Sequence, residues 1–244
     1  MANCGMSEIQ HALIHAASAP PVAREHFGRP CLRLDLSSAN PRLAGLNPAD
    51  PAAFGRWIAQ ELALAGAEWA AGGYGENRAV YGMSPLFGSA DQARSLHLGM
   101  DLWLPAGTEV YAALAGCVHS MANNANFGDY GPTVILEHEL DGQRLFSLYG
   151  HLAARTLGHL NVGQRVVAGE QIAWLGTPEE NLGWPPHLHF QLITEIGDYR
   201  GDYPGVCAPA ERELWLARCP DPMLLLPFHR FNGLASSARH AVLR

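Results

Sequence analysis

The spacing of apolar residues along the chain changes near residue 90. Before that point, one stretch carries apolar residues at intervals of three and four, the spacing of one helix face: Phe54, Trp57, Ile58, Leu62 and Ala65. Asp50 suits the N-cap of such a helix, and Pro51 suits its first position. We therefore predict a helix over about residues 51–70, ended by Gly72 and Gly73.

From about residue 95 the chain has the pattern of a series of short strands. Brief apolar segments are separated by Gly, Pro, Asn and Asp, and the predicted strands fall at 110–111, 116–118, 133–136, 145–149, 165–167, 171–174 and 188–193. Asp141-Gly142 stands between two of these segments and predicts a hairpin turn. A helical stretch over 210–218 is closed by Pro220.

These elements predict a mainly β protein with helical additions. We place a partly helical N-terminal appendage at 1–90, a β-rich catalytic domain at 91–227 that ends in the C-terminal helix, and a tail at 228–244. The pattern L-x-x-G-x-x-V-x-A occurs twice, at 104–112 and 160–168. It suggests two similar β motifs packed together, although a match at four positions also arises by chance.

Composition narrows the class of protein. Apolar residues make up 48% of the chain and charged residues 16%, as in a packed globular protein. The net charge of -7 argues against nucleic acid as a partner, and the absence of an apolar run of about 18 residues argues against a membrane span. The first ten residues lack a basic and apolar secretion signal, so we expect a cytoplasmic protein. The five cysteines form no C-x-x-C motif, and we expect reduced thiols rather than a cysteine metal site.

Candidate chemistry lies in three short segments that contain His97 and Asp101, then His151, then His187 and His189. Neutral imidazole and carboxylate are the ligand types of a catalytic zinc, which uses three protein ligands and keeps one position open. On a strand, His187 and His189 face the same side, about 6.6 Å apart along the chain. His97 and Asp101 would lie about 13 Å apart on a straight strand, so joint ligation requires a bend, which Gly99 permits.

The stretch from about Leu96 to Leu192 resembles the lysostaphin-like zinc metallopeptidases, many of which cleave peptide cross-links of bacterial cell walls. The motifs follow the order of that family, with H-x-G-x-D, L-P-A-G-T-x-V-Y-A, G-x-V, Y-G, Y-x-H-L, V-G-Q-x-V-x-x-G-E-x-I and H-L-H-F at 97–101, 104–112, 116–118, 130–131, 149–152, 162–172 and 187–190.

The resemblance implies a zinc ion held by His97, Asp101 and His189, with His151 and His187 unligated beside it. It implies an antiparallel β-sheet fold of the barrel-sandwich hybrid type, with a duplicated hybrid motif and an open groove. It also implies hydrolysis of a peptide or amide bond by a metal-activated water, with peptide or peptidoglycan-derived substrates. One of the two unligated histidines would move the proton and the other would stabilise the oxyanion; the sequence leaves their order open.

Two segments depart from the family pattern or lie outside it. The loop at 176–186 is acidic, bulky and rich in proline, and Trp184 within it either narrows the groove toward short substrates or only packs on the domain. Gln191 stands where the family often has Glu. The segment from Gly72 to Tyr81, with Phe87-Gly88 beyond it, either contacts substrate or forms a hairpin with a surface ion pair.

Residues before and within the catalytic part also resemble the peptidase-like module of larger proteins, where it lies between a kinase-like and an aminotransferase-like domain. This implies partner enzymes of those two kinds. Three functions therefore remain open: a zinc peptidase, a zinc amide hydrolase acting on a small cytoplasmic metabolite, and a non-catalytic metal-binding regulatory module.

Overall fold

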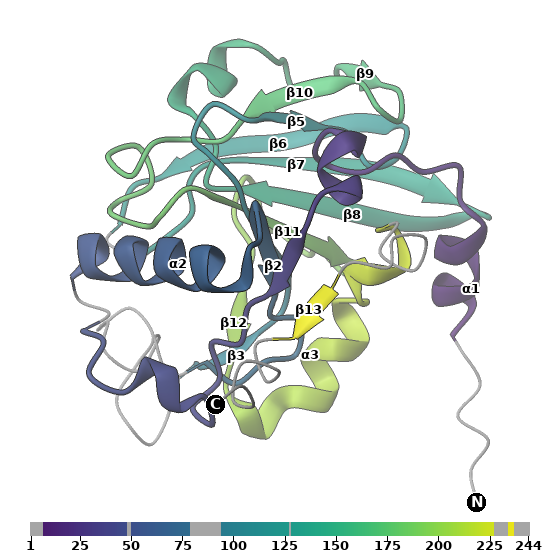
Figure 1. The fold of residues 1–244 in the computed structure, drawn as a ribbon. Coiled ribbons are helices and arrows are strands. Elements are labelled where there is room, and N and C mark those ends of the chain that lie inside the picture. Colours follow the sequence, from purple (N-terminus) through teal and green to yellow (C-terminus); the bar gives the residue numbers. More distant parts are fainter. Residues whose placement is uncertain (1–6, 48–49, 79–93, 127, 227–233, 237–244) are drawn as a thin grey trace, which may run out of the picture.

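A nine-stranded sheet dominates the computed structural model, which describes residues 7–47, 50–78, 94–126, 128–226 and 234–236 (Figure 1). The order of its strands is β13-β1-β2-β4-β11-β8-β7-β6-β9. In that order they span Leu234–Ser236, Cys31–Arg33, Trp69–Gly72, Met100–Trp103, His187–Ile193, Gln143–Gly150, Gly131–Leu140, Gly116–Asn124 and Arg165–Val166. Two small antiparallel sheets accompany it, β5 (Glu109–Tyr111) with β10 (Gln171–Trp174), and β3 (Leu96–His97) with β12 (Val206–Cys207).

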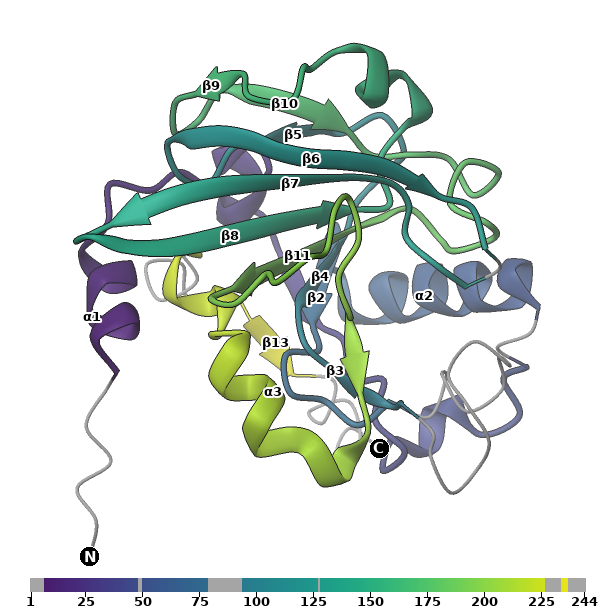
Figure 2. The same cartoon turned by 180° about the vertical axis from the view of Figure 1, so that it is seen from behind.

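Three α-helices flank the sheet, α1 (Glu8–His15), α2 (Pro51–Ala65) and α3 (Arg212–Arg218), as both views show (Figures 1 and 2). Short 3₁₀ helices cover Arg24–Gly28, Pro41–Leu43, Ala154–Gly158, Pro209–Glu211 and Pro222–Leu224. None of the helices described here is long and apolar enough to cross a membrane.

Every predicted strand is present; β6, β7 and β8 are longer than expected, and the other four differ from the predicted bounds by at most one residue. Asp141 and Gly142 join β7 to β8, and both have positive φ values, 50° and 77°, as a tight hairpin turn requires. The repeated motif is also visible: Gly107 and Gly163 turn with φ of 81° and 83°, and a buried valine follows each of them. The prediction of a mainly β protein is confirmed.

The sheet differs in two respects from a purely antiparallel one. Strand β1 pairs in parallel with both β2 and β13, so the sheet is mixed. Its outermost strands, β13 and β9, do not pair with each other, so the described strands form an open sheet and not a closed barrel.

Helix α2 begins where we predicted and ends earlier. The carboxylate of Asp50 accepts hydrogen bonds from the backbone N–H groups of Ala52 and Ala53, as an N-cap does. The helix ends at Ala65 because Gly66 adopts the left-handed conformation, with φ of 61°. Residues 69 and 70, which we predicted as the end of the helix, belong to strand β2 instead.

The part of the chain before residue 90 is built into the same sheet. Strand β2 pairs with β4, and β1 extends the sheet beyond β2. Helix α2 packs Phe54 and Ile58 against a buried cluster that includes Leu32 and Trp103. The boundary predicted near residue 90 falls within 79–93, outside the described residues, and stays a prediction; of the predicted tail, only 234–236 are described, as β13.

We predict that Gly72→Ala destabilises the protein. A Cβ at Gly72 would lie 2.6 Å from the backbone oxygen of Leu34, closer than packed atoms allow, so a strand has to shift. Forcing a methyl group into such a contact costs about 1–3 kcal/mol of unfolding free energy. Thermal or denaturant unfolding measures the change. Gly28→Ala is the matched control, because nothing lies within 4 Å of its added Cβ, and an equal effect of both substitutions would contradict the prediction.

Candidate metal centre

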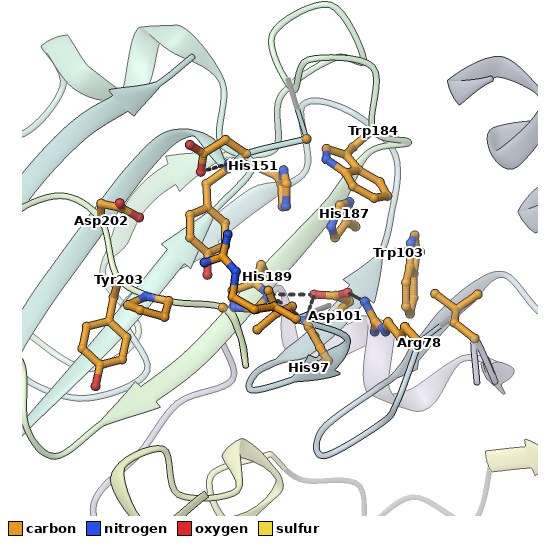
Figure 3. Close-up of a pocket in the computed structure, with 18 of the residues that line it drawn as sticks. Arg78, His97, Asp101, Trp103, His151, Trp184, His187, His189, Asp202 and Tyr203 are labelled. Atoms are coloured by element: carbon orange, nitrogen blue, oxygen red, sulfur yellow. Dashed lines mark hydrogen bonds and ion pairs between the residues drawn. The ribbon is translucent and has the colours of Figure 1, made fainter. Parts of the chain in front are cut away.

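One row of paired residues across four strands assembles the centre of the site. Asp101 on β4 pairs with Gly72 on β2 and with His189 on β11, and His189 pairs in turn with Gly150 on β8. Side chains of directly opposed residues lie on the same face, with Cβ atoms about 4.5–5.5 Å apart. The sheet register thus brings the Asp101 carboxylate to the His189 ring (Figure 3).

Gly99 produces the bend that ligation by both His97 and Asp101 requires. Strand β3 ends at His97 and β4 begins at Met100, so the chain is not one straight strand here. A Cβ at Gly99 would lie 2.6 Å from Cε1 of His189 and 2.9 Å from the backbone oxygen of Phe190. The glycine therefore also leaves the space that the His189 ring occupies.

Three donor atoms face one another at the spacing of metal ligands. Nε2 of His97 lies 2.9 Å from Nδ1 of His189 and 3.4 Å from Oδ1 of Asp101. Nδ1 of His189 and Oδ1 of Asp101 are 3.0 Å apart. On a tetrahedral zinc with bonds of about 2.0–2.1 Å, ligand atoms lie about 3.3 Å apart. The three side chains, all buried, form the candidate metal site of the described residues.

Hydrogen bonds on the far side of the two candidate histidine ligands orient their rings toward Asp101 and toward each other. Nδ1–H of His97 donates to the carbonyl of Gly73 at 3.0 Å, and Nε2–H of His189 donates to Oε1 of Gln191 at 2.9 Å. Gln191 is fixed because its Nε2 donates to the carbonyl of Pro204. Two unprotonated nitrogens and a carboxylate are thus aimed at one point, an arrangement that suits a cation.

Burial and charge keep these groups in the forms that bind a metal. Burial, followed by the nearby Arg78 charge, lowers the pKa of His97 to about 3. Burial alone would raise the pKa of Asp101, but its close contacts with His97, Arg78 and His189 hold it well below the usual range. A neutral imidazole and an ionised carboxylate are the ligating forms.

His187 and His151 lie together beside this centre, with ring centroids 4.0 Å apart. Burial lowers the pKa of both, and their mutual proximity adds to the effect on His151. Nδ1–H of His187 donates to the carbonyl of Pro185 at 2.7 Å, which leaves Nε2 of the neutral ring with a free lone pair. Nδ1 of His151 is buried with no hydrogen-bond partner in the described chain, and the residue adopts φ of 61°. A buried ring nitrogen without a hydrogen-bond partner in the chain typically bonds to a water or a ligand.

The centre lies in a pocket of about 260 Å³ whose walls are largely aromatic. Trp103 stacks on His187, with centroids 5.9 Å apart and 21° between the ring planes. Trp184 lies edge-on to Phe54 of α2, and its ring is 6.4 Å from both His151 and His187. On the opposite side of His189 lie Asp202 and Tyr203 (Figure 3). The half-buried Trp184 thus both packs on the domain and forms a wall.

The structure brings together all five predicted site residues: His97, Asp101, His151, His187 and His189. It also places His138 away from them, bonded to the carbonyl of Ala115 and the hydroxyl of Ser147. The four described cysteines are free thiols in the structure.

Two contributors were not recognised from the sequence. Gln191 stands two residues after His189 on the same strand face, and this spacing could have indicated its contact with that ring. Arg78 was expected in a surface ion pair or against substrate. The ion pair is buried and not on the surface: Arg78 is 3% exposed, and its Nη1 donates to Oδ2 of Asp101 at 2.6 Å. Arg78 also lines the pocket, and its contact with substrate stays a prediction. Tyr81, Phe87 and Gly88 of that segment lie outside the described residues.

Comparison with known proteins gives one family and several relatives. Residues 95–200 match the model of Peptidase family M23. Peptidoglycan DD-endopeptidase ShyA of Vibrio cholerae serotype O1 is 33% identical over 97 residues, 40% of this chain and 20% of that protein. The chain therefore spans about a fifth of the length of this curated relative.

Solved structures of peptidases also resemble the chain. The catalytic domain of lysostaphin from Staphylococcus simulans is 22% identical, with 64% of this chain and 94% of that one covered and a TM-score of 0.39. A zinc-containing peptidase from Vibrio cholerae is 25% identical. The match covers 45% of this chain and 29% of that chain, with a TM-score of 0.32. TM-scores this low carry no argument of their own.

The family match begins just before His97 and includes every residue of the candidate metal site and both histidines beside it. The motifs that suggested lysostaphin-like peptidases lie in the same span. Residues 95–200 of this chain are therefore similar to a Peptidase family M23 domain.

Proposed function

We propose that this protein is a zinc-dependent peptidase that hydrolyses a peptide or amide bond in peptidoglycan-derived peptides. One observation carries the proposal: three ligand atoms within 3.4 Å of one another share a pocket with two further neutral histidines. The M23 domain and the curated relative's name, a peptidoglycan endopeptidase, support the reaction and the substrate class.

Zinc fits the donor set better than calcium or magnesium, because two imidazole nitrogens and one carboxylate oxygen are typical of catalytic zinc sites and untypical of sites built from oxygen alone. His97, Asp101 and His189 would hold it. When bound, zinc supplies Lewis acidity to the scissile carbonyl and lowers the pKa of water. The chain's own residues then supply orientation, proton transfer and exclusion of solvent.

The two remaining histidines have different surroundings, which suggests different roles. Because Nδ1–H of His187 is committed to the carbonyl of Pro185, its Nε2 is the atom able to accept a proton, and we assign it as the general base. Nδ1 of His151 has no partner in the described chain, so it is available to donate to a carbonyl oxygen as negative charge develops there.

The walls of the pocket favour short peptides within this substrate class. Trp184 and Trp103 lie beside His187 on one side of the pocket. This bulky aromatic wall limits the thickness of a substrate strand that can enter the pocket. The relatives described above are peptidases, and none of them supports kinase-like or aminotransferase-like partners, so these are not part of the proposal.

Alanine substitutions separate metal binding from proton transfer. His97→Ala and Asp101→Ala should abolish stoichiometric zinc, measured by metal analysis. His151→Ala and His187→Ala should retain zinc and lose about 10²–10⁴-fold in turnover, the usual contribution of acid–base catalysis. Cleavage is measured on short peptides, small amides and purified peptidoglycan fragments. His159→Ala, an exposed histidine outside the pocket, is the control. Bound zinc with no cleavage of any substrate would favour a regulatory module. Cleavage of small amides alone would favour a metabolite hydrolase.

The acid limb of activity should lie below pH 6.5. Burial lowers the pKa of His187 from its ordinary value of 6.5, so the neutral base persists into more acidic solution. As pH falls through the lowered pKa, the base gains a proton and kcat/KM declines. The measurement is the pH profile of kcat/KM, with zinc content determined at each pH. A decline already centred at or above pH 6.5, with zinc retained, would rule out His187 as a base of lowered pKa.

Trp184→Ala should shift the preference toward larger substrates. Loss of the indole widens the pocket beside His187, so activity on peptidoglycan fragments should rise relative to activity on short peptides. The ratio of the two kcat/KM values measures the effect. Trp57→Ala is the matched control, because Trp57 stacks on Phe54 from α2 and does not line the pocket. An unchanged ratio in Trp184→Ala would show that this ring only packs on the domain.

A further inference from the structure

We propose that Arg78 is a positioning residue of the metal centre, which makes Asp101 a ligand through a single oxygen. Its guanidinium Nη1 donates to Oδ2 of Asp101 at 2.6 Å, while Oδ1 of the same carboxylate faces His97 and His189. One carboxylate oxygen of Asp101 therefore contacts the guanidinium, and the other faces the two candidate histidine ligands. This inference rests on the proposed metal site and adds a residue that lies outside the M23 match.

Arg78 is held in place from several directions. Its Nε donates to Oε2 of Glu76 at 2.9 Å, and its Nη2 lies 3.5 Å from the carbonyl of Gly72. Its guanidinium carbon lies 5.7 Å from the centroid of the Trp103 ring. With the side chain 3% exposed, few other positions are open to the guanidinium, so the contact with Asp101 is built into the fold.

The backbone around Arg78 is tied to the strand that carries His97. We call residues 72–78 the arm. Its second half forms backbone hydrogen bonds with Ser95 and with β3: the N–H of Arg78 donates to the carbonyl of Ser95, and the N–H of Gly75 donates to the carbonyl of His97. In return, the N–H of His97 donates to the carbonyl of Glu76. The arm also supplies the Gly73 carbonyl that orients the His97 ring. Two of the three candidate ligands are therefore oriented from the arm, and the third, His189, from Gln191 within the M23 domain.

A carboxylate held in this way has a defined role at a metal. A free Asp can rotate or bind through both oxygens, whereas Asp101 presents one oxygen at a fixed distance from two nitrogens. Groups that orient metal ligands in this manner typically contribute about 10–100-fold to metal affinity. The Arg78 charge also balances the buried carboxylate when no metal is bound, which keeps the ligand ionised and in position.

The test is metal binding by the full chain, read without any activity assay. Zinc affinity is measured by chelator competition, and coordination by the visible absorption of the Co²⁺-loaded protein. Arg78→Ala should weaken zinc binding about 10–100-fold and change the Co²⁺ spectrum, because Asp101 no longer has a fixed orientation. Arg78→Lys, which restores one charged donor, should recover most of the affinity and return the spectrum toward that of the wild type.

Arg42→Ala is the matched control. Arg42 forms an ion pair with the buried Glu61 of α2, with Nη2 2.5 Å from Oε1, and neither residue lines the pocket. Arg42→Ala should lower stability and leave zinc affinity and the Co²⁺ spectrum unchanged. If Arg78→Ala does not fold, Arg78→Gln, which keeps a neutral donor, takes its place with the same expected direction. A folded Arg78→Ala or Arg78→Gln with wild-type affinity and spectrum would overturn the inference. Wild-type protein that binds no zinc would instead overturn the proposed function.

Discussion

The pairing of β4 between β2 and β11 is the constraint on which the site depends. Asp101 stands in the middle of this pairing, opposite Gly72 on one side and His189 on the other. A slip of one residue in either pair would turn its side chain to the other face of the sheet. The apolar residues that flank Asp101, Met100 and Leu102, are buried in the main core and oppose such a slip. The packing of the core thus fixes the geometry of the polar site.

Electrostatic balance is the second element of this arrangement. A buried carboxylate without a partner is costly, and a buried arginine is equally so. Asp101 and Arg78 neutralise each other, and Glu76, which also pairs with Arg78, adds one negative charge. The imidazoles add no charge because burial keeps His97, His151 and His187 neutral. The pocket is therefore arranged for a cation and one reacting group, with its hydrogen-bonding groups already in place.

Much of this could be predicted from the sequence, and the limits have physical causes. The strands and the Asp141-Gly142 hairpin follow from local patterns of spacing and turn residues. The grouping of the five site residues was implied by the resemblance to a known family and not by local patterns alone. The end of α2 was missed because residues 69–71 continue the apolar run past Gly66, and their pairing with β1 and β4 makes them a strand. Arg78 was missed because its partner is 23 residues away and no periodic pattern links them.

The position of the arm has a consequence for how such a site can be inherited. The candidate ligands lie within the span that matches the family, whereas Gly73 and Arg78, which contact two of them, precede it. A recombination event that moved only residues 95–200 into another protein would carry the ligands and leave these orienting groups behind. The recipient chain would have to supply a carbonyl and a cation of its own at the same two places. The stretch that matches the family and the set of residues that arrange the candidate metal site therefore have different boundaries.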